Sequence, residues 1–418
     1  MDRMMRKGPK HEFGRELKSN AKTLSKELTT HMYVIDGGWL LHQVKWTSHL
    51  ISQIIQSYIK FVLSRFNKPT VIFDGYGNIP STKDHEHVRR SRGKKTSPDY
   101  KIMLDTKITC DRDTFLLNES NKSAFIKLMA HEMAESGIQT DHAEDDADTL
   151  IVKIAIGMAL NEPAPVTVVA QDTDILVLLC YHRPQSVTNL YLLSDSESPY
   201  DISSIEICER DELLFKYGWS GCDTVSYIHS HTKKSIYKLH FPEAVIKPFF
   251  EADASSGSIK HAGVEAMKIT YGIGCSQTLE GERHSRFLKQ ASRGKIDPDK
   301  LPPTEDASNE HALRVHHQLI TWKYMDTSKL SAIGRGWEMN ISGKLQPKMM
   351  SGLIAPNELM KGVCCNCKEG VSQCQTMRCS CRKEGMTCVS ACMFCYGSCS
   401  NGEAMMTTEE DLSSEDDI

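Results

Sequence analysis

Aspartate residues follow short, strand-like runs of apolar residues at widely separated places in this chain. The runs MYVID and TVIFD end at Asp36 and Asp74, and the run VTVVA is followed by Asp172 and Asp174. Between the first two runs lies a helical segment, ISQIIQSYIKFVLSRF, with apolar positions at 51, 54, 55, 58 and 62. This part of the sequence therefore predicts a β-α-β unit and a parallel sheet. Functional groups collect at the carboxyl ends of the strands in open parallel sheets, so we expect these aspartates to lie close together.

Three further aspartates extend this set. Asp146 and Asp148 open the apolar run DTLIVKIAIGMAL, which predicts a helix buried inside an α/β sandwich, and Asp223 lies in the turn-like sequence GWSGCDT. Like charges that are crowded together repel, so such a cluster requires raised pKa values or bound cations. Ligands that are all oxygen favour Mg2+ or Mn2+. The predicted ligands of these ions are Asp36, Asp74, Asp146, Asp148, Asp172, Asp174 and Asp223.

The length of 418 residues predicts two or three domains. We expect a basic and mobile leader at 1–30, an α/β domain at 31–240, a helical or irregular extension of unassigned role at 241–362, a cysteine-rich module at 363–401 and an acidic disordered tail at 402–418. Within the extension, a helix is predicted at 304–322, with Thr304 as its N-cap and with Ala312, Val315, Leu319 and Trp322 on one face. The three histidines of this helix are expected to be surface or packing residues.

The composition excludes a membrane protein of the helical kind. No window approaches the roughly 18 apolar residues that a membrane span requires. The basic leader has no apolar run behind it, so we do not expect a secretory signal, and we predict an intracellular protein. The net charge of −4 conceals a basic stretch at 83–101, which is the expected nucleic-acid face.

Ten of the fifteen cysteines lie within the 36 residues 364–399. In an intracellular chain, this concentration indicates bound metal rather than disulfides. A segment with so few large apolar residues needs such a metal in order to fold.

The order and spacing of the aspartate motifs resemble those of the flap-endonuclease/PIN-like superfamily of 5′ nucleases. The matching pieces are VIDGG, FDG, DDADTL, QDTD and GCD, and they cover about residues 32–235. The resemblance implies a parallel, twisted sheet flanked by helices. It also implies that the seven aspartates hold two Mg2+ or Mn2+ ions for phosphodiester hydrolysis, in which two ions about 4 Å apart stabilise the attacking and leaving oxygens.

The same resemblance implies that basic residues after the FDG motif contact the scissile phosphate. Lys83 and Arg90 are seven residues apart, close to two helical turns, so both side chains would lie on one helix face. They are the predicted catalytic cations, which stabilise charge that develops in the transition state. Backbone binding to nucleic acid is predicted for Arg89, Arg92, Lys94 and Lys95. The alternative for each of these residues is a solvated charged loop.

The cysteine-rich module resembles the tesmin-type CXC domain, a DNA-binding module in which nine cysteines hold three zinc ions. The corresponding ligands are Cys365, Cys367, Cys374, Cys379, Cys381, Cys388, Cys392, Cys395 and Cys399. Nine thiolates supply the twelve bonds of three tetrahedral zinc ions only if three thiolates bridge. Arg378, Arg382 and Lys383 are the predicted contacts to DNA. The alternative is a zinc-stabilised module for protein interaction.

Together these resemblances predict a metal-dependent nuclease that cleaves DNA, structured or single-stranded, and is delivered to DNA by its zinc module. We expect DNA rather than RNA as the nucleic-acid partner, and we expect no contact with a membrane. The predicted location is the nucleus. Two alternatives remain open. The first is a catalytically inactive nucleic-acid-binding or scaffold protein, and the second is an RNA-cutting nuclease of the PIN type.

Overall fold

The computed structural model describes residues 5–24, 30–75, 81–83, 93–144, 146–194, 198–207, 209–291, 297–326, 328, 330–353, 365, 367, 374–389, 392 and 395–402. The chain divides into two compact units. The first contains residues 1–259 and 313–348, and the second contains residues 260–312 and 349–418. The segment predicted as a single extension, 241–362, therefore contributes residues to both units.

The first unit is built on a six-stranded sheet with the strand order β3-β2-β1-β4-β5-β6. Its strands are β1 (Met32–Asp36), β2 (Pro69–Phe73), β3 (Gln139–His142), β4 (Val166–Val169), β5 (Leu190–Leu193) and β6 (Tyr200–Asp201). The first five are parallel to one another, and β6 pairs with β5 in the antiparallel sense. The predicted α/β fold with a parallel sheet is confirmed. Strands β3, β5 and β6 were not predicted; β3 is polar and β6 has only two residues.

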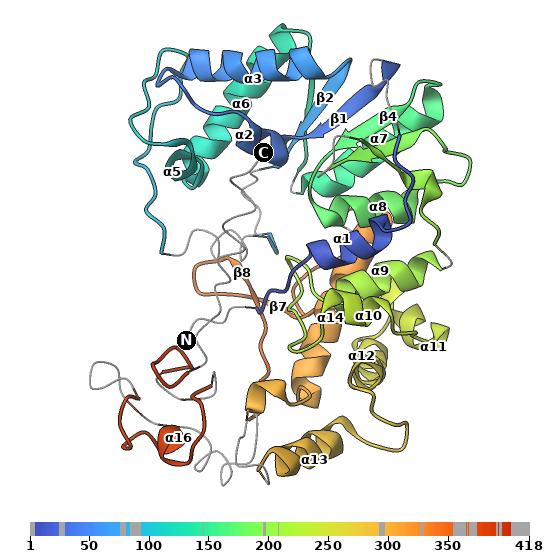
Figure 1. The fold of residues 1–418 in the computed structure, drawn as a ribbon, viewed down its shortest axis with the longest axis vertical. Helices are drawn as coiled ribbons and strands as arrows, with labels where there is room; N and C mark the ends of the chain where they lie inside the picture. Colours follow the sequence, from blue (N-terminus) through green and yellow to red (C-terminus); the bar gives the residue numbers. More distant parts are fainter. Residues whose placement is uncertain are drawn as a thin grey trace. The chain divides into compact units, whose positions relative to one another are not determined.

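Helices cover both faces of this sheet, as Figure 1 shows. One face carries α2 (Gly37–Gln43), α3 (Ile51–Arg65), α5 (Arg112–Leu116) and α6 (Glu119–Glu135), and the other carries α7 (Ala147–Asn161) with α8 (Thr173–His182) packed beside it. Side chains alternate between these two layers along each strand. In β1, Tyr33 and Ile35 join the core formed with α2, α3 and α6, whereas Val34 is buried outside that core. Burial on both faces explains why these strands read as unbroken apolar runs.

The register of the sheet brings separate parts of the sequence to one edge. Asp36, the last residue of β1, pairs with Ile72 of β2, and Ile35 pairs with Val169 of β4. Asp74 and Asp172 therefore follow the carboxyl ends of the two strands that flank β1. The sheet topology places the predicted metal ligands together, as parallel strands must.

The leader differs from the expectation of a mobile segment. Its helix is α1 (His11–Lys18), and Phe13 and Leu17 on this helix are buried. Phe13 packs against the rings of Tyr217 and Tyr237, with centroids 4.9 and 5.1 Å away. The reason is that two apolar residues four apart are sufficient to anchor a short helix to a larger apolar surface, although they give no distinct periodic signal.

The remaining elements complete the two units. In chain order they are α9 (Arg210–Trp219), α10 (Lys233–Tyr237), α11 (Glu243–Ile246), α12 (Ser256–Tyr271), α13 (Leu279–Ala291), α14 (Glu305–Tyr324), β7 (Trp337–Met339), β8 (Leu345–Pro347) and α16 (Ser380–Lys383), with single 3-10 turns at Ile202–Ser204, Lys247–Phe250 and Pro298–Lys300. Among the described residues, no helix is long and apolar enough to cross a membrane.

The predicted helix at 304–322 is confirmed as α14. The side chain of Thr304 accepts a hydrogen bond from the backbone amide of Ala307 at 3.2 Å, as an N-cap does. His316 and His317 are packing residues, since their Nε2 atoms bond to the carbonyl oxygens of Glu251 and Leu330 at 2.9 and 3.1 Å.

Burial lowers the pKa of both His316 and His317 from the ordinary 6.5 to about 4. The unfolded chain binds protons near pH 6.5 and the folded chain only near pH 4, so stability is fully present above pH 6.5 and is lost as the pH falls toward 4. We expect the free energy of unfolding to fall by about 2 kcal/mol per histidine between pH 7 and pH 5. Urea unfolding over a pH series measures this effect.

The double variant His316→Gln, His317→Gln should show a flatter pH profile than the wild type, because glutamine keeps a side-chain donor but does not titrate. His131→Gln, at an exposed position of α6, is the matched control and should leave the slope unchanged. Equal slopes for the double variant and the wild type would contradict the assignment.

Candidate metal centres

Three of the seven aspartates are helix N-caps. Asp36, Asp146 and Asp172 precede α2, α7 and α8, and each accepts a hydrogen bond from the backbone amide two residues later, at 2.7, 3.2 and 2.9 Å. Asp148 and Asp174 lie in the first turns of α7 and α8. A helix N-terminus carries partial positive charge, so it both orients and stabilises these carboxylates. The chain thus delivers five carboxylates from strand-to-helix junctions.

Asp74 and Asp223 join this group from other elements. Asp74 follows β2, and its side chain accepts from the amide of Ala147 at 3.2 Å, across to the start of α7. Asp223 lies in the turn after α9. The structure therefore brings the seven predicted metal ligands from five separate segments to one side of the sheet.

The ionisation of these groups reflects their crowding. Burial, followed by the charges of Asp74 and Asp172, raises the pKa of Asp36 to about 7. Burial and the neighbouring Asp146 raise the pKa of Asp148, and burial and Asp172 raise that of Asp174. Each shift signals a carboxylate whose charge is poorly stabilised by the protein alone. An added cation would stabilise the charged form of these carboxylates.

The oxygens fit a cation of that kind. Ligand atoms of Asp148, Asp172 and Asp174 all lie within 4.8 Å of one another. This spacing allows one ion to touch more than one carboxylate, and an all-carboxylate donor set suits Mg2+ or Mn2+. The residues present are therefore compatible with divalent-ion binding at this place.

Lys83, the predicted catalytic cation, lies at the same site. Its ammonium group forms an ion pair with Asp146 and lies 3.5 Å from Asp148 Oδ2. Burial opposes the charged form, but the two carboxylates raise the pKa of Lys83 well above its usual value. Lys83 is therefore a fixed positive charge beside the start of α7.

Two lysines of the leader reach the opposite part of the site, and the sequence analysis did not predict either of them. Lys10 Nζ lies 3.1 Å from Asp174 Oδ2 and 3.0 Å from Asp223 Oδ2, and Lys7 Nζ lies 2.9 Å from Asp223 Oδ1. No sequence signal could have found them, because a basic leader is usually solvated and its path depends on tertiary packing.

Tyr217 is a third residue that sequence reasoning missed. It is buried on α9, and its hydroxyl donates to Asp174 Oδ1. Burial and the charge of Asp174 raise the pKa of Tyr217 well above its usual value, so it stays a neutral donor. No local pattern could have found it, because Tyr217 on α9 reaches Asp174 on α8 through packing between these two helices.

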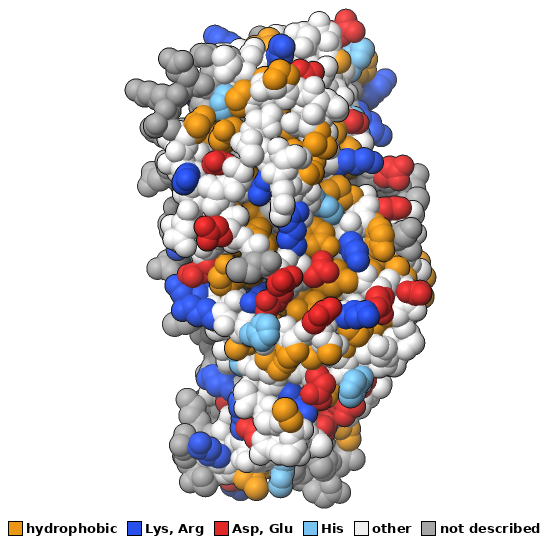
Figure 2. Space-filling view, turned by 90° about the vertical axis from the view of Figure 1, so that its right-hand side faces the viewer, with side chains coloured by type: hydrophobic (Ala, Val, Ile, Leu, Met, Phe, Trp, Pro, Cys, Tyr) orange, Lys and Arg blue, Asp and Glu red, His pale blue; other side chains and the backbone are white. Residues whose placement is uncertain are grey.

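The other predicted basic residues are not brought to the carboxylates in the described part of the chain. Arg89, Arg90 and Arg92 lie outside the described residues. Lys94 and Lys95 are exposed in the loop before α5. On the face drawn in Figure 2, Lys and Arg side chains are interspersed with Asp and Glu. This face is therefore not a uniformly basic surface.

The cysteine-rich module contains a second candidate centre. Its thiols pack together at Sγ–Sγ distances of 3.6 to 3.7 Å, for example between Cys365 and Cys374, between Cys379 and Cys388, and between Cys381 and Cys392. None of these pairs is a disulfide. A tetrahedral zinc ion with Zn–S bonds of about 2.3 Å separates its sulfurs by about 3.8 Å, so the observed spacing fits zinc.

The thiols form three groups of four that could each hold a metal ion. The groups are Cys365, Cys374, Cys388 and Cys395; Cys365, Cys381, Cys388 and Cys392; and Cys365, Cys367, Cys374 and Cys379. Cys374 and Cys388 belong to two groups each, as bridging ligands do, and Cys365 belongs to all three. Of the nine predicted ligands, Cys399 alone is in none of these groups, within the residues that the structure describes.

The basic residues of the module differ in their contacts. Arg378 and Lys383 are exposed. The guanidinium of Arg382 donates to the carbonyl oxygens of Cys374 and Gln375 at 3.2 and 2.9 Å, so this side chain stabilises the module itself. Arg378 and Lys383 are the better placed of the three for a contact to another molecule.

No known family profile and no curated protein matches this chain. Similar solved structures include the catalytic core of Rad2 in complex with a DNA substrate, at 14% identity and a TM-score of 0.39 over 77% of this chain and 96% of that chain. A mutant of the T5 5′-exonuclease is similar at 13% identity and a TM-score of 0.36, over 71% of this chain and 89% of that chain. The T5 D15 protein co-crystallised with metal ions is similar at 13% identity and a TM-score of 0.40, over 73% of this chain and 94% of that chain. A likeness at these TM-scores carries no argument about function, which has to come from the residues of the site.

The shared thiols make Cys388 a sensitive position for metal content. We expect Cys388→Ser to lose at least one zinc ion per chain, because two of the three groups use this sulfur. Elemental analysis of the purified full chain measures the number of ions bound. Cys275→Ser, an exposed cysteine outside the module, is the control and should keep the full zinc content. Unchanged zinc content in Cys388→Ser would contradict a bridging role.

Proposed function

We propose that this protein is a divalent-metal-dependent nuclease that hydrolyses phosphodiester bonds, with DNA as the expected substrate. The observation that carries the proposal is the convergence of seven aspartates on one side of a parallel sheet, with Lys83 paired to two of them. The aspartates are proposed to hold two Mg2+ or Mn2+ ions. When bound, such ions supply positive charge to the attacking and leaving oxygens of the reaction.

The residues of the chain have separate tasks in this proposal. The N-cap hydrogen bonds of Asp36 and Asp172 fix the carboxylates before any ion arrives, which lowers the cost of assembling the site. A substrate phosphate is itself negative, so a cation that belongs to the protein would stabilise it in addition to the metal ions. Lys83 supplies such a charge and is proposed to stabilise the phosphate as its charge increases in the transition state. Arg90, predicted for the same role, lies outside the described residues.

The zinc module is proposed to bind DNA and so to bring the nuclease to its substrate, which agrees with a nuclear location. Arg378 and Lys383 are its exposed cations. Basic residues of this kind contact phosphates and supply affinity that depends on salt.

One observation favours the alternative of a non-catalytic nucleic-acid-binding protein. Lys7, Lys10 and Lys83 already neutralise part of the acidic site. The seven carboxylates nevertheless outnumber these three ammonium groups, so the site attracts further cations. A direct assay decides between the two functions.

The deciding variant is Asp36→Asn. The amide keeps the oxygen that caps α2, but it removes the charge that a metal ion requires. We expect Mg2+- or Mn2+-dependent cleavage of labelled flap, gapped and single-stranded DNA by the wild type, and a loss of rate on the order of 100-fold in the variant. Without divalent ions, the variant should have a higher Tm than the wild type, because one repelling charge is gone.

Asp141→Asn is the matched control, since Asp141 is an exposed carboxylate on β3 of the same sheet. It should leave both the rate and the Tm unchanged. Matched single-stranded RNA belongs in the same assay, and preferential cleavage of RNA would favour the PIN-type alternative. If the wild type binds nucleic acid but cuts neither polymer, the proposal fails and the non-catalytic function is the better description.

A further inference from the structure

The leader places a partly buried cation inside the acidic site. Lys10 Nζ lies 3.0 Å from Asp223 Oδ2, 3.1 Å from Asp174 Oδ2 and 3.7 Å from Asp172 Oδ2, and the side chain of Lys10 is only 18% exposed. Three carboxylates from two different elements thus surround one ammonium group. A metal ion bound by these three carboxylates would occupy a position close to that of the ammonium group.

The carboxylates on this side of the site are satisfied by the protein itself. Asp174 accepts from Tyr217 through Oδ1 and pairs with Lys10 through Oδ2. Asp223 pairs with Lys7 through Oδ1 and with Lys10 through Oδ2. A divalent ion that binds here has to displace at least one of these donors.

The other side of the site is different. Asp36 accepts hydrogen bonds from backbone amides. Among the described residues no lysine or arginine forms an ion pair with Asp36 or Asp74, and the nearest cation, Lys83, pairs with Asp146 and acts on Asp74 only through its charge. The two halves of the cluster therefore differ in their need for an added cation.

Lys10 is held in place on both sides along the chain. After it, Phe13 is fully buried between the rings of Tyr217 and Tyr237. Before it, the carbonyl of Arg6 accepts from the amide of Tyr227 at 2.8 Å.

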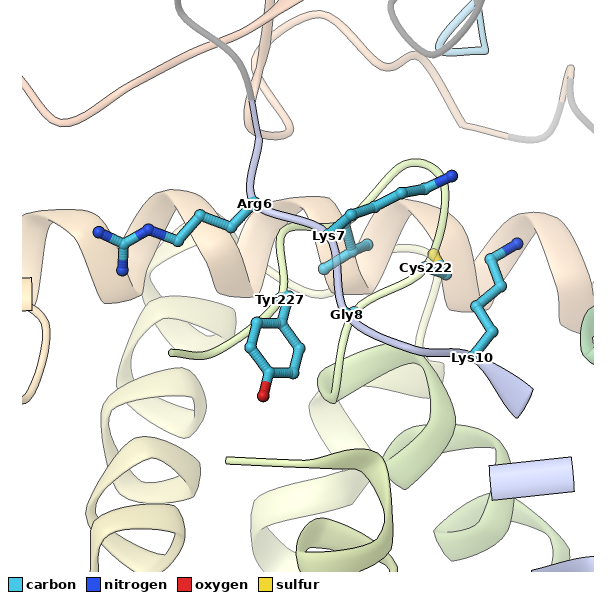
Figure 3. Close-up of a pocket in the computed structure, with 8 residues that line it drawn as sticks. Arg6, Lys7, Gly8, Lys10, Cys222 and Tyr227 are labelled. Carbon is cyan, nitrogen blue, oxygen red and sulfur yellow. The ribbon is translucent and has the colours of Figure 1, made fainter. Parts of the chain in front are cut away.

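The leader also approaches Tyr227 very closely at Gly8, where a Cβ atom would lie 2.2 Å from the tyrosine ring. Only glycine allows this path. Figure 3 shows the leader crossing the loop that carries Cys222 and Tyr227, with Lys7 and Lys10 extending to the same side and Arg6 to the other. Lys10 is consequently a built-in part of the site and not a side chain of a loose end.

We propose that Lys10 is an internal cation that takes one of the two cation positions of the acidic cluster in the substrate-free protein. The free protein then binds one divalent ion tightly, on the side of Asp36 and Asp74. A second ion binds only by displacing the ammonium group, which costs the three ion pairs of Lys10. This inference rests on the proposed metal site. According to it, the leader limits the number of divalent ions that this site binds.

Calorimetric titration of the zinc-loaded full chain with Mn2+, together with electron paramagnetic resonance of the unbound Mn2+, counts the ions and gives their Kd values. We expect one tight site in the wild type and a second site at least about tenfold weaker. In Lys10→Met the second site should become at least about tenfold tighter. Lys22→Met, an exposed lysine of the same leader, should behave as the wild type.

Phe13→Ala provides a second route to the same result, because it loosens the leader and keeps the lysine. It should also strengthen the second Mn2+ site. Asp36→Asn should remove the tight site in every background. Thermal unfolding with and without Mn2+ adds a readout that needs no catalysis, and Mn2+ should raise the Tm of Lys10→Met more than that of the wild type.

Two equal Mn2+ sites in the wild type would overturn this inference and leave the proposed nuclease intact. The same holds if neither Lys10→Met nor Phe13→Ala changes the second site. If neither the wild type nor any variant binds Mn2+, both the inference and the proposed metal-dependent function fail.

Discussion

The repulsion among carboxylates at the end of the sheet is the constraint on which the rest of the first unit depends. Seven aspartates cannot be gathered there unless other groups stabilise their charge. The fold supplies this stabilisation in two ways. Helix N-termini of α2, α7 and α8 stabilise and orient five of the aspartates. The ammonium groups of Lys7, Lys10 and Lys83 pair with five of the seven aspartates.

The leader shows how a short segment becomes part of a site that lies far from it in sequence. Its anchors are apolar and local, whereas its effect is electrostatic. Phe13 and Leu17 bury against the helices that carry Asp174 and Tyr217, and this packing brings Lys10 to the carboxylates. Burying an unpaired ammonium group would cost several kcal/mol, so the carboxylates are as necessary to the leader as the leader is to them.

The cysteine-rich module follows a different principle. Its described core consists mainly of cysteines, with Met386 and Val389 as its other buried apolar residues. Such a core is small, and the groups of thiols that could hold metal ions make up most of it, so metal binding and folding of the module would be coupled. Sharing Cys365, Cys374 and Cys388 among these groups would let few residues serve several ions.

The sequence by itself determined the elements that are continuous in the chain. The apolar runs that end in Asp36, Asp74 and Asp172 predicted the parallel sheet, and the apolar spacing at 51, 54, 55, 58 and 62 predicted α3 with these positions buried. The convergence of the aspartates followed from topology, because parallel strands end at one edge of a sheet. Local periodicity and the direction of parallel strands can both be predicted from the order of the residues.

Only the tertiary structure decided which cations face these aspartates. Lys83 could be predicted because it follows a recognisable motif, but Lys10 and Tyr217 reach Asp174 from α1 and α9 through packing between segments that are distant in the chain. The sharing of thiols in the cysteine-rich module was likewise undetermined, since a list of cysteines does not say which sulfurs meet. In each case the physical reason is the same. A pairwise contact between remote residues depends on how apolar surfaces pack, and no local pattern in the sequence records that packing.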